Sequence, residues 1–179
     1  MKVTVRTVRS SDLAAIVEIY NQAVKLKSAT ADLSPVSLES RAKWLAEHDP
    51  ANHPDFVAQS GKVVVGWCSI SEYRPGRRAL RHTAEISYYV HEDYRRMGVA
   101  SKLVKHAIRE CPRLRIKTFI AILLDINVPS VRLLEKFGFQ KWGHMPNVAD
   151  FDDKECSHLY YGLRLGRARS RSSIKSRSV

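Results

Sequence analysis

The stretch from Glu85 to Ser101 constrains the fold of this chain more than any other, because it reads as an apolar strand, a short basic turn and the start of a helix. This order brings the unpaired N–H groups of a helix N-terminus next to the end of a strand. Gly98 lets the backbone approach a ligand closely, and Arg95 and Arg96 add positive charge. The stretch predicts a phosphate or pyrophosphate site, although many helices that begin in this way bind nothing.

Two familiar nucleotide-binding motifs do not fit this stretch. The dinucleotide fingerprint needs three glycines, and only Gly98 is present here. A P-loop needs Gly-Lys-Ser/Thr at the start of the helix, and that sequence does not follow.

Hydrophobic periodicity predicts a mixed α/β fold, because strand patterns and helix patterns both recur along the chain. Strands are expected over Lys2–Val8, Phe56–Gln59, Lys62–Ser71, Thr83–Val90, Arg115–Leu123, Gln140–His144 and Cys156–Leu165, with a polar loop between the last two. Helices are expected from a cap at Ser10 or Ser11 to about Val24, and over Ser37–Glu47, Gly98–Glu110 and Ser130–Phe137.

The composition indicates one globular domain with a basic tail. Residues 1–165 are expected to fold as the domain, whereas 166–179 are rich in Arg and Ser and have too few apolar residues for a core. The formal net charge is +12, and five of these positive charges lie in the tail, which leaves +7 for the domain. We expect a solvated tail without a function, although it would also suit contact with nucleic acid or an acidic surface.

Location and metal content are constrained by what the sequence lacks. No apolar run approaches the roughly 18 residues that span a membrane, and the first residues alternate like a strand rather than a signal peptide. Cys68, Cys111 and Cys156 are an odd number without metal-ligand spacing, so they are expected in the core as thiols. We therefore expect a cytoplasmic protein without membrane contact and without a bound metal.

Two motifs together resemble the GNAT superfamily of N-acetyltransferases. Arg95-x-x-Gly98-x-Ala100 is similar to the acyl-CoA-binding motif of that superfamily, and the segment from Asn127 to Phe139 is similar to its asparagine-to-Gly-Phe helix. The two motifs occur in the expected order, with one helix and one strand between them. Four further segments resemble the phosphinothricin/methionine-sulfoximine acetyltransferase branch, namely Ile19–Val24, Arg81–Glu85, Tyr89-Val90 and Met145–Val148.

The resemblance implies a mostly antiparallel sheet whose fourth and fifth strands, Thr83–Val90 and Arg115–Leu123, splay apart to admit acetyl-CoA. The pantetheine arm would pair with the strand edge near Tyr88 and Val90, and the pyrophosphate would lie on the amides that open the following helix. Asn127 would contact the pantetheine arm, and it also suits a helix cap. The implied cofactor-binding residues are Tyr88, Tyr89, Val90, Arg95, Arg96, Met97, Gly98, Val99, Ala100, Ser101 and Asn127.

The implied reaction is direct transfer of the acetyl group to the α-amine of a small amino acid, such as phosphinothricin or methionine sulfoximine. Glu85 matches the general base of the family, and burial next to Ile86 and Tyr88 is expected to raise its pKa. By position alone, Glu85 also fits a surface carboxylate at a strand start. The amide N–H of Val90, expected at a strand bulge, is the implied donor to the developing oxyanion.

Three positions depart from the family pattern. Leu134 stands where many relatives carry a tyrosine or histidine that protonates the leaving thiolate, and leucine has no proton to donate. A water molecule, the substrate ammonium group or a tyrosine such as Tyr160 or Tyr161 would have to replace it. Ala31 replaces an aromatic residue, and Asp153–Glu155 replaces a Gly-Arg-Trp-like segment, so a different acceptor side chain is expected.

The acceptor and the assembly are the least constrained predictions. Arg74 and Arg81 are candidates to bind the carboxylate of an amino acid, and both also fit solvated charge in a basic loop. The implied substrate-binding residues are Arg74, Arg81, Glu85, Ile86 and Ser87. The resemblance implies a homodimer. Two other functions remain open, which are acetylation of a protein N-terminus or lysine, and CoA or RNA binding without catalysis.

Overall fold

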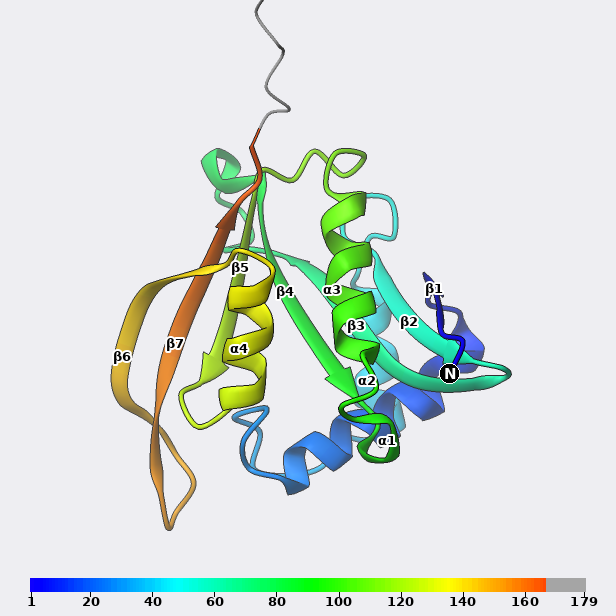
Figure 1. Ribbon diagram of the computed structural model, residues 1–179, viewed down its shortest axis with the longest axis horizontal. Coiled ribbons are helices and arrows are strands. Elements are labelled where there is room, and N and C mark those ends of the chain that lie inside the picture. Colours follow the sequence, from blue (N-terminus) through cyan, green and yellow to red (C-terminus); the bar gives the residue numbers. More distant parts are fainter. Residues whose placement is uncertain (167–179) are drawn as a thin grey trace, which may run out of the picture.

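The structure is a computed structural model that describes residues 1–166. It has a seven-stranded sheet with helices on both faces (Figure 1). The strand order is β1-β2-β3-β4-β5-β7-β6, and every neighbouring pair is antiparallel except β4 and β5. The predicted basic tail lies outside the described residues, apart from Gly166.

The elements follow the predicted order. The strands are β1 (Thr4–Thr7), β2 (Asp55–Ser60), β3 (Val63–Glu72), β4 (Thr83–Val90), β5 (Thr118–Leu124), β6 (Gln140–Asp150) and β7 (Glu155–Arg164). The helices are α1 (Leu13–Lys25), α2 (Leu38–Ala46), α3 (Val99–Glu110) and α4 (Val128–Lys136), with short 3-10 turns η1 (Ser10–Asp12), η2 (Arg78–Leu80) and η3 (Glu92–Tyr94).

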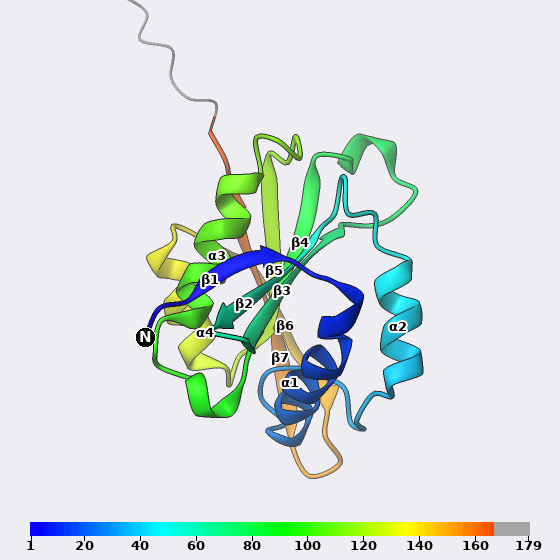
Figure 2. The same cartoon turned by 90° about the vertical axis from the view of Figure 1, so that its right-hand side faces the viewer.

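Helices α1 and α2 cover one face of the sheet, and α3 and α4 cover the other (Figure 2). Consecutive side chains of a strand point to opposite faces, so β3 contributes to both layers. Trp67 packs with Ile16 and Val57 under α1, whereas its neighbour Cys68 packs with Leu103 under α3. The alternation explains why the buried strand β3 is apolar along most of its length.

The first helix begins differently from the prediction. Neither Ser10 nor Ser11 caps it with a side-chain hydrogen bond. Instead, Asp12 accepts from the amide of Arg9 (2.8 Å) and from both terminal nitrogens of Arg6 (2.6 and 2.8 Å). A carboxylate that pairs with a guanidinium group holds the turn more firmly than a serine hydroxyl, which accounts for the difference.

The predicted polar loop between the last two strands is wrong over most of its length. Strand β6 continues from the predicted end at His144 to Asp150 and pairs with β7 again at Ala149. The register shifts between Met145 and Ala149, and Asn147 has a positive φ of 51°. An irregularity of this kind accommodates a proline and polar residues in an edge strand, which masked the strand pattern.

The predicted boundaries also move at α4 and β5. Helix α4 begins two residues earlier than expected, because Pro129 occupies its first turn and Asn127 caps it. Strand β5 begins at Thr118 rather than at Arg115, which has a positive φ of 56° and lies in a turn.

The splayed strands predicted at the centre of the sheet are confirmed. Strands β4 and β5 pair in parallel at only three positions, of which Glu85 with Ile120 is the last. Figure 1 shows the two strands diverging beyond this point, with α3 and α4 on either side of the opening. The gap exposes main-chain groups in the middle of a sheet, where a neighbouring strand would otherwise bond them.

The cysteine prediction is also confirmed. Cys68, Cys111 and Cys156 are buried free thiols. Within residues 1–166, no helix is long and apolar enough to cross a bilayer.

Candidate active site

The gap between β4 and β5 contains a small recess with a volume of about 30 Å³. It is bounded by both strands, by α4 and by Ala29 from the connection between α1 and α2. Of the predicted site residues, Ile86, Ser87, Tyr88, Tyr89 and Asn127 line it.

The main chain of β4 presents unpaired groups to this recess. In an antiparallel ladder, only every second residue bonds to the neighbouring strand. The amide of His91 donates to Val65 on β3 (3.0 Å), and the β3–β4 register is regular up to Val90. The main-chain groups of Tyr88 and Val90 therefore point the other way, into the gap.

The expected bulge at Val90 is absent, because the β3–β4 register shows no shift. A bulge is not needed to free this amide. The alternation of the ladder and the early end of β5 pairing already leave the Val90 N–H facing the opening.

Glu85 lies where the two strands separate, on the face that α1 and α2 cover. Its side chain is half-buried, and burial raises the pKa of its carboxyl group. A raised pKa makes a carboxylate a stronger base. The position and the environment thus suit proton abstraction from an amine in the opening.

The start of α3 is arranged to receive an anion. Gly98 caps the helix with φ 78°, and a side chain there would meet no atom within 4 Å. Lys102 donates the first helical hydrogen bond to Gly98 (3.1 Å), so the amides of Val99, Ala100 and Ser101 have no partner inside the helix. The first turn carries no acidic side chain, and Arg96 precedes it with φ 61°. The residues present therefore fit a pyrophosphate.

Several predicted cofactor residues contribute only their main chain. Val99 is buried in the core, so its amide alone can contact a ligand. Tyr89 stacks on Trp67 (ring centroids 4.8 Å apart) on the α1 side of the sheet. Met97 is 56% exposed beside the helix start, where its side chain is free to cover a ligand.

Asn127 and Ser130 lie together at the start of α4. The side-chain oxygen of Asn127 accepts from the amide of Ser130 (3.3 Å), which is the predicted capping role. This capping bond uses only the side-chain oxygen of Asn127, and it also fixes the orientation of the side-chain nitrogen.

The sequence reasoning missed the contribution of Ser130 to the recess. Its hydroxyl lies 2.8 Å from that of Tyr88 and joins α4 to β4 across the gap. Burial raises the pKa of Tyr88 to about 12, and the contact with Ser130 opposes this increase. Ser130 belongs to the Asn127–Phe139 motif, so the sequence did point to this residue. Nothing in the sequence indicated that it contacts Tyr88.

The alternative proton donors are placed differently. Leu134 is buried and lines the recess, so this position offers no proton. The hydroxyl of Tyr161 donates to Glu135 (3.1 Å) on the exposed side of α4. The hydroxyl proton of Tyr161 is therefore used in a hydrogen bond outside the recess.

The two candidate arginines, Arg74 and Arg81, do not line the recess. Arg81 is exposed and donates to the carbonyl of Arg78 (3.0 Å) within its own turn. Arg74 is exposed and lies over the ring of Tyr73 at 5.8 Å. Both lie near the beginning of β4, at the same end of the strand as Glu85.

Of the two regions that depart from the family pattern, the Asp153–Glu155 segment contacts the chain just before Ala31. Lys27, after α1, forms an ion pair with Asp153 in the β6–β7 turn at 3.7 Å. Both side chains are exposed, so the pair adds little stability. The ion pair joins the β6–β7 turn to the segment that carries Ala29, which lines the recess.

Diverging central strands, a free main-chain edge and an open helix N-terminus together define a protein built to hold an acyl-CoA. The Acetyltransferase (GNAT) family profile matches residues 15–139, and the chain belongs to this family of acetyltransferases. Within the described residues, no group of three or more His, Cys, Asp or Glu side chains is arranged to hold a metal ion.

The chain is similar to characterised and provisionally named relatives over most of its length. It is 38% identical over 163 residues to YwnH of Bacillus subtilis (strain 168), provisionally named a phosphinothricin acetyltransferase, with 90% of this chain and 99% of that protein covered. It is 32% identical to the L-amino acid N-acyltransferase MnaT of Escherichia coli (strain K12), with 81% and 84% covered. The crystal structure of a phosphinothricin acetyltransferase from Sinorhizobium meliloti in complex with AcCoA superposes with a TM-score of 0.87, at 26% identity over 93% and 90% of the chains.

Proposed function

We propose that this protein transfers the acetyl group of acetyl-CoA to the α-amine of a small amino acid or analogue of the phosphinothricin and methionine sulfoximine type. The observation that carries the proposal is the conjunction of Glu85, the free β4 edge and the open start of α3 around one gap. Named relatives support the acceptor class, since one acetylates L-methionine sulfoximine and L-methionine sulfone at 32% identity.

The α3 N-terminus would hold the pyrophosphate through the amides that lack helical partners, with Arg95 and Arg96 adding charge. The edge of β4 at Tyr88 and Val90 would bond the pantetheine arm as an additional strand does. Asn127 would orient the arm from the other side of the gap. Bound in this way, acetyl-CoA supplies an acetyl group that is already activated as a thioester.

Glu85 would accept a proton from the acceptor ammonium or amine, either directly or through one water molecule. Its raised pKa favours this step, because a stronger base removes the proton more readily. The amide of Val90 would stabilise negative charge as it develops on the carbonyl oxygen. A backbone donor held in a ladder needs no reorganisation, and such donors are worth about 3 kcal/mol.

Leu134 cannot protonate the leaving thiolate, and Tyr88 would donate this proton instead. Its hydroxyl lines the recess, keeps its proton because burial raises its pKa to about 12, and is oriented by Ser130 at 2.8 Å. The raised pKa keeps the phenol protonated near neutral pH, so its O–H can hydrogen-bond the developing thiolate, while the same rise makes it a weaker acid than an exposed tyrosine.

The acceptor carboxylate would be bound by Arg74, with Arg81 as the second candidate. Both guanidinium groups are exposed at the Glu85 end of β4, and the side chain of Arg74 is free to turn toward an acceptor. The border formed by Lys27 and Asp153 would set the size of the accepted side chain.

A thiol-release screen tests the function. Purified protein with acetyl-CoA should release free thiol with L-phosphinothricin, L-methionine sulfoximine or L-methionine sulfone, and not with their N-methylated or α-hydroxy analogues. Binding of acetyl-CoA without thiol release by any amino acid, amino-acid analogue, polyamine or peptide would refute the proposal.

A protein acceptor is the second candidate. A ribosomal-protein-alanine N-acetyltransferase from Brucella melitensis superposes with a TM-score of 0.85 at 29% identity. Peptides beginning with alanine therefore belong in the same screen, and preference for them over free amino acids would move the assignment to protein acetylation.

We also retain the homodimer as a proposal. Strand β6 is an edge strand that exposes Trp142, Met145 and Val148 by 44–50%. A face of this kind is suited to a second copy of the chain. Light scattering after size exclusion should give twice the mass of 20.4 kDa.

A further inference from the structure

A polar row crosses the sheet beneath α1 and α2, starting at Glu85. Ser71 on β3 lies directly opposite Glu85 in the ladder, so the two side chains share one face of the sheet. Cross-strand partners of this kind have Cα atoms about 5.5 Å apart. The two side chains form no direct hydrogen bond, so a link between the carboxylate and the hydroxyl would need one side-chain rotation or one water molecule.

The row continues from Ser71 to an imidazole. The hydroxyl of Ser71 lies 3.2 Å from Nε2 of His48, and Ser69 lies 3.1 Å from Ser71 and 3.4 Å from the same nitrogen. On its other side, Nδ1 of His48 lies 3.0 Å from the carbonyl of Trp44. A carbonyl oxygen only accepts, so Nδ1 carries the proton and Nε2 of the neutral ring accepts from the serines.

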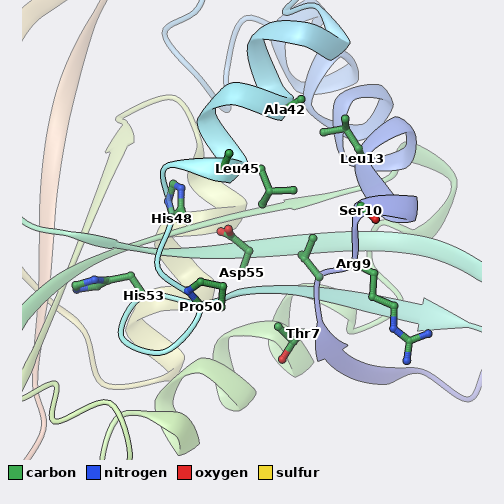
Figure 3. A pocket seen from close by; sticks show the side chains of 12 residues that line it. Thr7, Arg9, Ser10, Leu13, Ala42, Leu45, His48, Pro50, His53 and Asp55 are labelled. Atoms are coloured by element: carbon green, nitrogen blue, oxygen red, sulfur yellow. The ribbon is translucent and has the colours of Figure 1, made fainter.

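The far end of the row opens to a second pocket. His48 and Asp55 line a cavity of about 320 Å³ between the start of α1, helix α2 and the α2–β2 connection (Figure 3). Asp55 is 5% exposed, and its Oδ1 has no hydrogen-bond partner among the described residues. Burial raises the pKa of its carboxyl group, and the nearby His48 opposes this increase. A buried carboxylate of this kind is stabilised by positive charge on the imidazole.

We propose that His48 is the proton outlet of the acetyl-transfer site, that is, the group that receives protons from Glu85 through Ser71 and releases them to water. The proposal rests on the proposed role of Glu85 as base. After Glu85 has taken a proton from the amine, its O–H donates to Ser71 Oγ while the Ser71 hydroxyl proton passes to His48 Nε2. One O–H bond at Glu85 breaks and one N–H bond at His48 forms, which leaves Glu85 ionised and His48 as imidazolium. Loss of one proton to water in the pocket restores the neutral ring.

The outlet has a clear reason to exist. An acceptor and a cofactor in the gap would cover Glu85 on its solvent side, so a base that has taken a proton there needs another route to lose it. Imidazole is the side chain that changes its charge near neutral pH, and the open pocket that His48 lines would give it a route to water away from the gap.

The charged groups around His48 come from three elements. Asp55 lies on β2 and Arg41 on α2, and the positive charges of His48 and Arg41 both oppose the rise that burial causes in the pKa of Asp55. Arg41 is buried over the rings of Tyr20 (4.2 Å) and Trp44 (4.7 Å). His53, in the α2–β2 connection, lines the same pocket.

Chemical rescue tests the outlet. With acetyl-CoA and L-methionine sulfone at saturation, His48→Ala should lower kcat by about tenfold or more and change both KM values little. Added imidazole and its methylated derivatives should restore the rate, and the restored rate should rise with the pKa of the added base. His53→Ala, the matched control from the same pocket, should keep the parental kcat and show no response to imidazole.

A second pair of variants covers the case in which His48→Ala does not fold. Ser71→Ala should lower kcat in the same way, and Ser71→Thr, which keeps the hydroxyl, should retain most of it. Parental kcat in folded His48→Ala or Ser71→Ala, or a loss that no base restores in folded His48→Ala, would overturn the outlet.

Glu85→Gln separates the two proposals. If this variant retains the parental rate, the base role fails and the outlet fails with it. If it loses the rate while His48→Ala does not, only the outlet is wrong.

Discussion

The hydroxyl groups of Tyr88 and Ser130 lie 2.8 Å apart and connect β4 to α4 across the gap in the sheet. Both residues line the recess together with Leu134, which has no proton to donate, and burial keeps the pKa of Tyr88 raised to about 12. We have proposed that Tyr88 supplies the proton that Leu134, the departure from the family pattern at this site, does not offer.

Tyr88→Phe should lower kcat by about 100-fold, because the variant keeps the ring but loses the proton donor. The Kd for acetyl-CoA should change by less than about threefold, since the main chain of Tyr88 is unaffected. Single-turnover thiol release and calorimetry measure the two quantities. Tyr161→Phe is the matched control, because its hydroxyl bonds Glu135 instead, and the reverse order of effects would assign the donor role to Tyr161.

Glu85→Gln should lower kcat/KM by about 100-fold or more, with acetyl-CoA affinity retained. The loss should be largest above the pKa of Glu85 and below that of the acceptor amine, where Glu85 is ionised and the amine is protonated and needs a base. Burial raises the pKa of Glu85, so in the parent kcat/KM should increase with pH through a value above the roughly 4.3 of a solvent-exposed glutamate. A pH–rate profile that is the same in both proteins would remove Glu85 from the mechanism.

Gly98→Val should weaken acetyl-CoA binding by about tenfold or more, because a branched side chain would project into the open space at the start of α3. The variant also places a branched residue at φ 78°, which strains the backbone. Gly76→Val controls for this strain, since Gly76 has φ 79° and equally open surroundings in a remote loop. Equal loss of affinity in both variants would refute the anion site.

Asp12→Ala should lower the free energy of unfolding by about 3 kcal/mol, because it leaves the Arg6 guanidinium and the Arg9 amide without their acceptor. Arg113→Ala, which breaks the exposed pair with Glu110, should cost less than about 1 kcal/mol. Urea denaturation at pH 7 measures both.

The same pair makes a pH prediction. The hydrogen bonds from Arg6 hold the pKa of Asp12 below its ordinary value. Its contribution is therefore complete above the unfolded-state pKa of about 3.9 and is lost as pH falls through the lower folded-state value. The stability of the parent and of Asp12→Ala should converge at acidic pH, and a constant difference would contradict the pairing.

Local pattern was sufficient to predict most elements and the anion-binding turn. Gly98 and the amides after it, the proposed anion site, are consecutive residues, so their spacing in the sequence already fixes their geometry. Strand β6 was shortened in the prediction because Pro146 and Asn147 interrupt its alternation, and only its pairing with β7 restores it.

The sequence by itself determined the class of this protein through two motifs that resemble the GNAT superfamily, and each motif is legible because its residues are contiguous and their hydrogen-bonding needs are local. Tertiary structure alone decided what surrounds the reacting groups. Tyr88 meets Ser130 across 42 positions, and His48 reaches Ser71 across 23. Such contacts depend on the point at which β4 separates from β5 and on the way α2 packs over the sheet. Neither of these arrangements can be predicted from the periodicity of apolar residues along the chain.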